Sequence, residues 1–242
     1  MKGSEERMSV LDPEIRAALV AHLAATEPSP AILNEVPIRY ARGRYTAGRA
    51  DVLAVSDVVA GYEIKSDADG RSRLDRQVLA YGALCDFCTI VVGPRHLAHV
   101  RSKLPASWGI LVAEPRAQGL FLRRERFAEC NADVEPAAIA RQFWKGECVA
   151  LLKKHGAKID RRALVHDIWP LVEALPLDVL RAALRVALVA HENALKDNRP
   201  RLREIQRKNR HHEKDLRAKR EEWAARTAEI LARPKPQEAR TA

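Results

Sequence analysis

Apolar residues recur with helical spacing near the start of the chain. Ile15, Leu19 and Leu23 fall on one face of a helix, and the preceding DPE supplies an N-cap residue followed by a proline at the first helical position. This pattern predicts a helix from about 13 to 25. The segment 32–40 then mixes β-branched residues with Pro37, which favours an extended piece at the edge of a sheet.

Short β-rich runs follow. The runs 50–56 and 58–66 flank Asp57 and predict a hairpin with this residue at its turn, while the basic, glycine-bearing stretch 42–49 before them predicts a flexible turn. The later predicted elements are a helix over 73–83, a strand over 88–93, a helix over 97–104, a strand over 108–113 and an edge strand over 119–123. Strands that alternate with helices after a hairpin predict an α/β fold, with a mixed sheet flanked by helices.

Strand patterns end at Pro136, and the rest of the chain is predicted to be helical. The predicted helices cover about 137–155, which ends at Gly156, then 161–174, 176–196 and one long helix over 200–233. We therefore expect three parts: an α/β domain over 1–130, a helical subdomain over 136–197, and a long basic helix with a flexible end over 198–242.

The charge of the chain indicates which class of molecule it binds. Lys and Arg number 42 against 32 Asp and Glu, a net charge of +10, and residues 199–226 hold eleven of the former and five of the latter. Such a surface favours binding to a polyanion, and nucleic acid is a more common partner of this kind than an anionic membrane. Four cysteines are too few for a disulfide scaffold, the first residues lack the apolar stretch of a secretory signal, and no apolar run approaches the ~20 residues that cross a bilayer. We expect a cytoplasmic protein with no membrane partner.

Three ionisable residues of the hairpin carry the candidate chemistry. A hairpin symmetric about Asp57 places Asp51 across from Glu63, with Cβ atoms about 5 Å apart. The side-chain period of two turns Lys65 to the same face as Glu63. Two carboxylates this close repel each other unless a cation lies between them, and Mg²⁺ prefers oxygen ligands. The pair predicts a Mg²⁺ or Mn²⁺ site held by Asp51 and Glu63, although surface charges near a hairpin give the same pattern.

Such a site suits the hydrolysis of a phosphodiester. A bound divalent ion polarises a phosphoryl oxygen and supplies a hydroxide nucleophile, while an ammonium such as that of Lys65 orients the water or offsets charge in the transition state. Arg73 and Arg76 open the next predicted helix, and either is a candidate phosphate ligand, although exposed arginines are also common at helix starts.

Four runs of the sequence resemble a known superfamily. The runs GRADVLAV, GYEIKSD, RLDRQVLAY and CTIVVGPRHL resemble the PD-(D/E)XK nucleases, most closely a bacterial family among them. The similarity extends from about Asp12 to Glu114 and fades in the helical region, where FWKGECVALLKK resembles a W-x-x-E helix of such relatives. It implies a restriction-endonuclease-like mixed β-sheet flanked by helices, followed by the C-terminal helical region, and a metal-dependent nuclease whose partner is DNA.

The resemblance also implies roles for individual residues. Asp51 matches the first acidic ligand of the superfamily, and Glu63 and Lys65 match its E-x-K. Gln77 and Tyr81 match a Q-x-x-x-Y motif that exonuclease-like members use beside the metal to contact substrate. Their spacing places both on one face of a helix. We therefore expect Gln77, Tyr81 and the neighbouring arginine at position 73 to bind substrate.

A further acid found in many relatives has two candidates in this chain. Glu14 lies on the first predicted helix, whereas Glu35 lies nearer the hairpin, and we favour Glu35 as a catalytic residue. Ala50 stands where the superfamily name expects proline, which many members also lack. Two other interpretations stay open: an inactive nuclease-fold module that binds nucleic acid or a protein partner, and a helical protein that forms a homodimer through its C-terminal segment.

Overall fold

The computed structural model describes residues 10–26, 30–40, 46–67, 73–117, 119–160 and 162–194. These residues form a six-stranded mixed sheet flanked by helices, so the predicted α/β class is confirmed. The long basic helix predicted over 200–233, and with it the predicted C-terminal dimer contact, lies outside the described residues. No helix in the described part is long and apolar enough to cross a membrane.

The six strands follow one another across the sheet in chain order. Their bounds are Ala31–Tyr40 (β1), Thr46–Val55 (β2), Val59–Lys65 (β3), Phe87–Val92 (β4), Gly109–Arg116 (β5) and Gly119–Arg126 (β6). The pairs β1–β2, β2–β3 and β5–β6 are antiparallel, whereas β3–β4 and β4–β5 are parallel. The two segments predicted at sheet edges are β1 and β6, and Pro37 lies on edge strand β1, where its lack of an N–H is tolerated.

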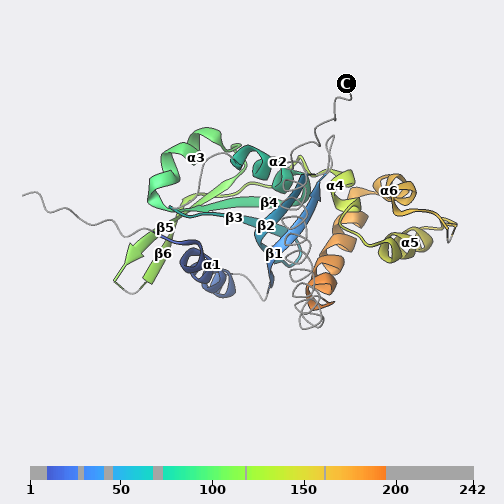
Figure 1. Ribbon diagram of the computed structural model, residues 1–242, viewed down its shortest axis with the longest axis horizontal. Helices are drawn as coiled ribbons and strands as arrows, with labels where there is room; N and C mark the ends of the chain where they lie inside the picture. The colour runs from blue at the N-terminus through green and yellow to red at the C-terminus, as the bar shows by residue number, and fades with distance from the viewer. Residues whose placement is uncertain are drawn as a thin grey trace, which may run out of the picture. The chain divides into compact units, whose positions relative to one another are not determined.

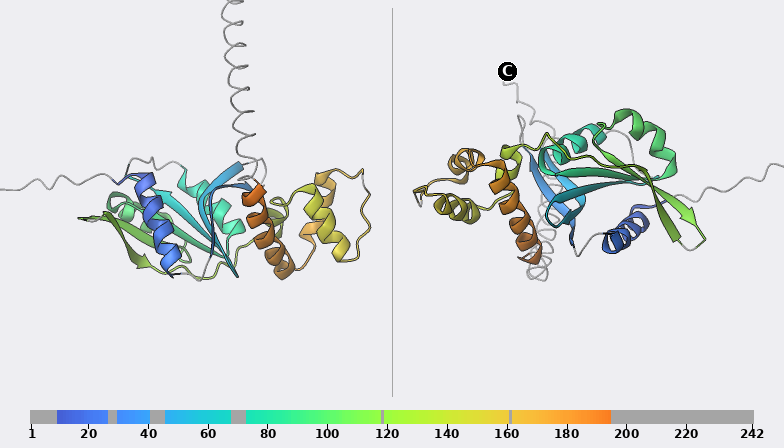
Figure 2. Two further views of the ribbon diagram at one scale, coloured as in Figure 1. Left: turned by 90° about the horizontal axis from the view of Figure 1, so that it is seen from below. Right: turned by 180° about the vertical axis from the view of Figure 1, so that it is seen from behind.

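Helices cover both faces of the sheet. On one face lies α1 (Asp12–Thr26), which buries Ile15, Leu19 and Leu23. On the other face lie α2 (Leu74–Leu84) and α3 (Leu97–Lys103), the latter preceded by a short 3₁₀ turn (Figure 1). The right-hand view of Figure 2 shows the same arrangement from behind. The sheet therefore has a separate apolar core on each side.

The helices that follow the sheet share one of these cores. They are α4 (Pro136–Ala140), α5 (Lys145–Lys154), α6 (Val165–Glu173) and a helix over 177–194. Their buried residues, among them Ile139, Leu152 and Leu184, belong to the same apolar cluster as Leu53 of β2 and Leu84 of α2. The helical region is thus packed against the core on the α2 side of the sheet.

The single helix predicted over 137–155 is wrong, because the chain breaks it into α4 and α5. Between them, the Gln142 side-chain amide donates to the main-chain carbonyl of Arg39 on edge strand β1 (3.1 Å), and its Oε1 accepts the Arg39 N–H (3.4 Å). Helix α5 begins where the N–H of Trp144 donates to Oε2 of Glu147 (2.6 Å). The break satisfies backbone groups of a strand far away in sequence, which local spacing does not reveal.

The predicted hairpin register is confirmed. Val52 pairs with Tyr62 and Val55 with Val59, so the pairing is symmetric about Asp57. The bends at 56–58 close the hairpin between β2 and β3.

The predicted flexible turn over 42–49 is wrong for its last residues. Residues 46–49 belong to β2, where Gly48 pairs with Ile38 and Arg49 with Pro37. A Cβ at position 48 would lie 3.3 Å from Cβ of Ala80, so a glycine here lets β2 approach α2 closely. Residues 41–45 of the stretch lie outside the described residues.

We expect Gly61→Ala to destabilise the protein strongly. A Cβ at this position would lie 2.6 Å from Cδ1 of Tyr81 and 2.7 Å from Sγ of Cys85, in the tight packing of α2 on β3. Overpacking of this kind costs about 1–3 kcal/mol of unfolding free energy, measured by urea denaturation. Gly82→Ala is the matched control, because nothing lies within 4 Å of its Cβ position and alanine favours a helix by about 1 kcal/mol. Similar losses in both variants would contradict this packing.

Candidate functional site

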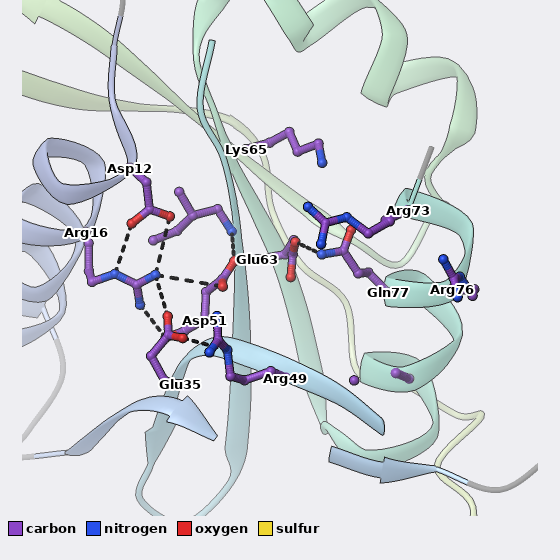
Figure 3. Close-up of a pocket in the computed structure, with 13 residues that line it drawn as sticks. Asp12, Arg16, Glu35, Arg49, Asp51, Glu63, Lys65, Arg73, Arg76 and Gln77 are labelled. Atoms are coloured by element: carbon purple, nitrogen blue, oxygen red, sulfur yellow. Dashed lines mark hydrogen bonds and ion pairs between the residues drawn. The ribbon is translucent and has the colours of Figure 1, made fainter. Parts of the chain in front are cut away.

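A cleft of about 650 Å³ opens where β2 and β3 part. The ladder between the two strands ends at the pair Val52–Tyr62, and beyond it Oδ2 of Asp51 accepts the main-chain N–H of Ile64 (2.9 Å). The Asp51 carboxylate thus replaces a main-chain acceptor at the point of divergence. Polar side chains from α1, β1, β2, β3 and α2 surround the cleft (Figure 3). Six of the predicted site residues line it: Glu35, Asp51, Glu63, Lys65, Arg73 and Gln77.

Glu63 is the most deeply buried acid of the cleft, with 1% of its surface exposed. The Gln77 side-chain amide donates to its Oε1, while its Oε2 has no hydrogen-bond partner among the described residues. Burial, and then the charge of Asp51, raise the pKa of Glu63 to about 8, although the Tyr81 hydroxyl and the Lys65 ammonium act in the opposite direction. The Glu63 carboxyl is therefore largely protonated at neutral pH, and a cation bound here would displace the proton.

The structure brings Asp51 and Glu63 together. The charge of Asp51 helps to raise the pKa of Glu63, so the two carboxyl groups lie close enough to repel each other. Burial also raises the pKa of Asp51, against the opposing effects of the Ile64 N–H and of the nearby Arg16. Two carboxyl groups this close titrate together, and a cation that neutralises both would relieve the cost of burying them.

The positively charged side chains of the cleft differ in their burial. Lys65 lies on the same face of β3 as Glu63 and is buried, with 5% of its surface exposed. Arg73 and Arg76 lie at the start of α2, and both are exposed. Lys65 is thus placed beside the acid pair, whereas the two arginines are placed to meet an anion that enters from solvent.

Tyr81, which was predicted to contact substrate, is not among the residues that line the cleft. The residue is 1% exposed, and its hydroxyl accepts the N–H of Asp51 (2.8 Å) and donates to the carbonyl of Tyr62 (3.1 Å). The hydroxyl therefore bridges β2 and β3 where they part. Gln77 and Tyr81 do share one helix face, but the sheet covers the turn that carries Tyr81. Through its hydrogen bond to the Asp51 N–H, Tyr81 holds the backbone of Asp51 in place.

Of the two candidates for the further acid, Glu35 lines the cleft and Glu14 does not. Oε2 of Glu14 accepts the N–H of Leu11 (3.2 Å) at the start of α1. Glu35 has a φ of 59°, which is uncommon for a residue other than glycine. Its Oε1 pairs with Arg16 (2.9 Å) and its Oε2 with Arg49 (2.5 Å).

Two lining residues, Asp12 and Arg16, were not predicted from the sequence. They form an ion pair one turn apart on α1, with 3.2 Å between Oδ1 and Nε. Their i, i+4 spacing is visible in the sequence. Nothing along the chain, however, indicates that the Arg16 guanidinium also reaches β1 and β2.

The donor set of the cleft suits a hard cation. No group of three or more His, Cys, Asp or Glu side chains able to hold a metal ion occurs within the part of the chain that the structure describes. Mg²⁺ is commonly held by one or two carboxylates, with waters and substrate phosphates as its other ligands. Asp51 and the unpaired Oε2 of Glu63 supply two carboxylates, which fits Mg²⁺ or Mn²⁺ better than a metal that prefers nitrogen or sulfur.

Comparison with known proteins identifies one family. A family described as bacteriophage P4 protein cII matches residues 6–219, a span that includes every residue lining the cleft. No curated protein and no solved structure gives a significant match. Because the match covers far more than half of the 242 residues, the chain belongs to the bacteriophage P4 protein cII family.

Proposed function

We propose that the protein is a Mg²⁺- or Mn²⁺-dependent nuclease that hydrolyses phosphodiester bonds in DNA, and that its sheet has the restriction-endonuclease-like fold. The observation that carries the proposal is the buried Glu63, which lines the same cleft as Asp51 and whose Oε2 is unpaired among the described residues. Burying two carboxyl groups side by side is costly, and a divalent cation shared between them offsets this cost. The family description states no activity, so the proposal depends on the chemistry of the cleft.

Asp51 and Glu63 would hold the ion, which when bound polarises a phosphoryl oxygen and activates a water molecule. The main-chain N–H of Ile64 fixes Oδ2 of Asp51, and the amide of Gln77 fixes Oε1 of Glu63. One oxygen of each carboxyl group is thus held by the protein. Because protein groups fix the pair in advance, little reorganisation is needed when a cation binds.

The cations of the cleft supply the electrostatic part of the reaction. Lys65 is buried next to Glu63, where an ammonium offsets the negative charge that develops on a phosphate in the transition state. Arg73 and Arg76, exposed at the start of α2, would neutralise phosphates of the bound strand. The net charge of +10 favours the approach of a polyanion such as DNA.

A cleavage assay with the full chain tests the proposal. We expect DNA to be cut in Mg²⁺ or Mn²⁺ and to stay intact in EDTA. Lys65→Ala should reduce the cleavage rate by about 10²–10³-fold, the typical effect of removing one group that stabilises transition-state charge. Lys103→Ala, an exposed lysine on α3, is the matched control and should cut within about twofold of the wild type. Equal activity in the Lys65 variant and the control would reject the assigned role.

A second candidate is a nuclease-fold module that binds nucleic acid without cutting it. It is favoured by the absence, among the described residues, of a third side chain that could ligate a metal beside Asp51 and Glu63. This candidate predicts that DNA binding is the same in EDTA and in Mg²⁺ and is accompanied by no cleavage with either metal ion.

A further inference from the structure

One arginine joins three elements at the cleft. Arg16 extends from α1, where it pairs with Asp12 through Nε (3.2 Å), to Oε1 of Glu35 on β1 (2.9 Å) and to the main-chain carbonyl of Asp51 on β2 (2.6 Å). Its side chain is 21% exposed, so these contacts are partly shielded from water. Figure 3 shows the guanidinium surrounded by the three acidic residues.

The contact with Asp51 is made to the backbone rather than to the carboxylate. Nη1 of Arg16 lies 2.6 Å from the Asp51 carbonyl oxygen, whereas its Nη2 lies 3.8 Å from the carboxylate Oδ1. The second distance is too long for a hydrogen bond. Oδ2 is held by the N–H of Ile64, and the backbone N–H of Asp51 by the Tyr81 hydroxyl. The residue is therefore fixed at three points, while Oδ1 keeps its capacity to bind a cation.

We propose that Arg16 is a positioning residue for Asp51, and that Glu35 holds this arginine rather than acting as the further catalytic acid. This inference rests on the proposed function, because it concerns how one metal ligand of that site is held. Both Glu35 oxygens are paired with arginines, so binding a metal would require breaking one of these pairs. Glu35 also has a left-handed backbone conformation, which is unfavourable for a residue other than glycine and is consistent with a carboxylate held between two arginines.

The opposite role for Arg16 would be competition, in which the guanidinium and the metal bind the same acidic residues. The distances argue against it, because Nη2 of Arg16 is too far from Oδ1 of Asp51 for a hydrogen bond, whereas its Nη1 makes a short hydrogen bond to the Asp51 carbonyl oxygen. The two roles also predict opposite results. Competition predicts tighter metal binding when Arg16 is removed, and positioning predicts weaker binding.

Calorimetric titration of Mn²⁺ into the full chain without nucleic acid tests the inference. We expect Arg16→Lys to weaken Mn²⁺ binding by about 10- to 100-fold, the typical effect of removing a group that holds a metal ligand, because lysine keeps the charge but cannot reach all three partners. Arg141→Gln is the matched control. Arg141 is 23% exposed and also donates to a main-chain carbonyl (Ala137, 2.7 Å) and to a carboxylate (Glu173), but it does not line the cleft. Its loss should lower the thermal stability without changing Mn²⁺ affinity.

The double variant tests the role of Glu35. Glu35→Gln alone should weaken Mn²⁺ binding, and this effect should disappear in the Arg16→Lys background, because Glu35 acts through Arg16. Additive effects, or binding by Arg16→Lys that equals or exceeds that of the wild type, would overturn the inference while leaving the proposed function intact. A wild type that binds no Mn²⁺, or one whose binding survives Asp51→Asn, would overturn both.

Discussion

Glu63→Gln is expected to reduce metal-dependent DNA cleavage by at least about 10³-fold while making the protein more stable at alkaline pH. The loss of activity follows because the amide keeps the shape of the side chain and an acceptor for Gln77, but removes the negative charge that would hold a divalent ion. The gain in stability follows because a charge buried at 1% exposure no longer forms.

The sign of the stability effect follows from the raised pKa of Glu63. The native protein holds this proton up to about pH 8, whereas the unfolded chain releases it near pH 4.3. Between these values the native state binds more protons than the unfolded state, so this group makes the unfolding free energy fall as the pH rises. Glutamine abolishes this contribution. Relative to the wild type, the variant should therefore gain on the order of 3 kcal/mol between pH 5 and pH 8 in the absence of divalent metal.

Urea denaturation of wild type and variant at pH 5 and pH 8 measures the gain, and a cleavage assay measures the loss. Glu14→Gln is the matched control, because this acid lies on α1 outside the cleft. We expect it to change neither quantity appreciably. A Glu63 variant that is inactive but shows no alkaline gain would indicate that Glu63 is ionised in the native protein at neutral pH.

The second large effect is on metal binding by the wild type. A divalent ion at Glu63 must displace the proton that the group holds below about pH 8. We therefore expect the Mg²⁺ affinity to rise by about tenfold per pH unit between pH 6 and pH 7.5, and to level off above pH 8. The cleavage rate at low Mg²⁺ concentration should follow the same profile.

Calorimetry in two buffers of different ionisation enthalpy measures the proton release directly. Near pH 6.5 we expect close to one proton, that of Glu63, to be released for each Mg²⁺ bound. In Glu63→Gln any residual Mg²⁺ binding should lose this pH dependence. An affinity that is constant from pH 6 to pH 8 would contradict displacement of a proton by the metal.

The sequence predicted the elements of the sheet well because each is specified locally. Asp57 sits between two β-rich runs, and the symmetric register about it follows from strand geometry alone, so the approach of Asp51 to Glu63 could be anticipated. The Q-x-x-x-Y spacing likewise predicted a shared helix face. It did not show that the second residue of the motif lies under the sheet, because burial depends on how α2 packs on β3 rather than on spacing along α2.

The contacts that the sequence did not reveal join distant segments. Arg16 lies thirty-five residues from Asp51, and its role depends on α1 crossing the sheet so that its polar edge faces β1 and β2. The break between α4 and α5 depends on Gln142 meeting Arg39, which lies 103 positions earlier. Helical periodicity reports which face of an element is apolar, but it does not say which element a polar side chain will meet.

The pairing of Gln142 with Arg39 has a consequence for the edge strand β1. A border strand such as β1 offers unpaired N–H and C=O groups on which another polypeptide can assemble, and folded proteins commonly screen such groups. Here one amide side chain from the helical region occupies both backbone groups of Arg39. The segment between α4 and α5 therefore covers the backbone groups of one residue of this edge strand, and a fragment that ended before Gln142 would leave those groups open to pairing with another chain.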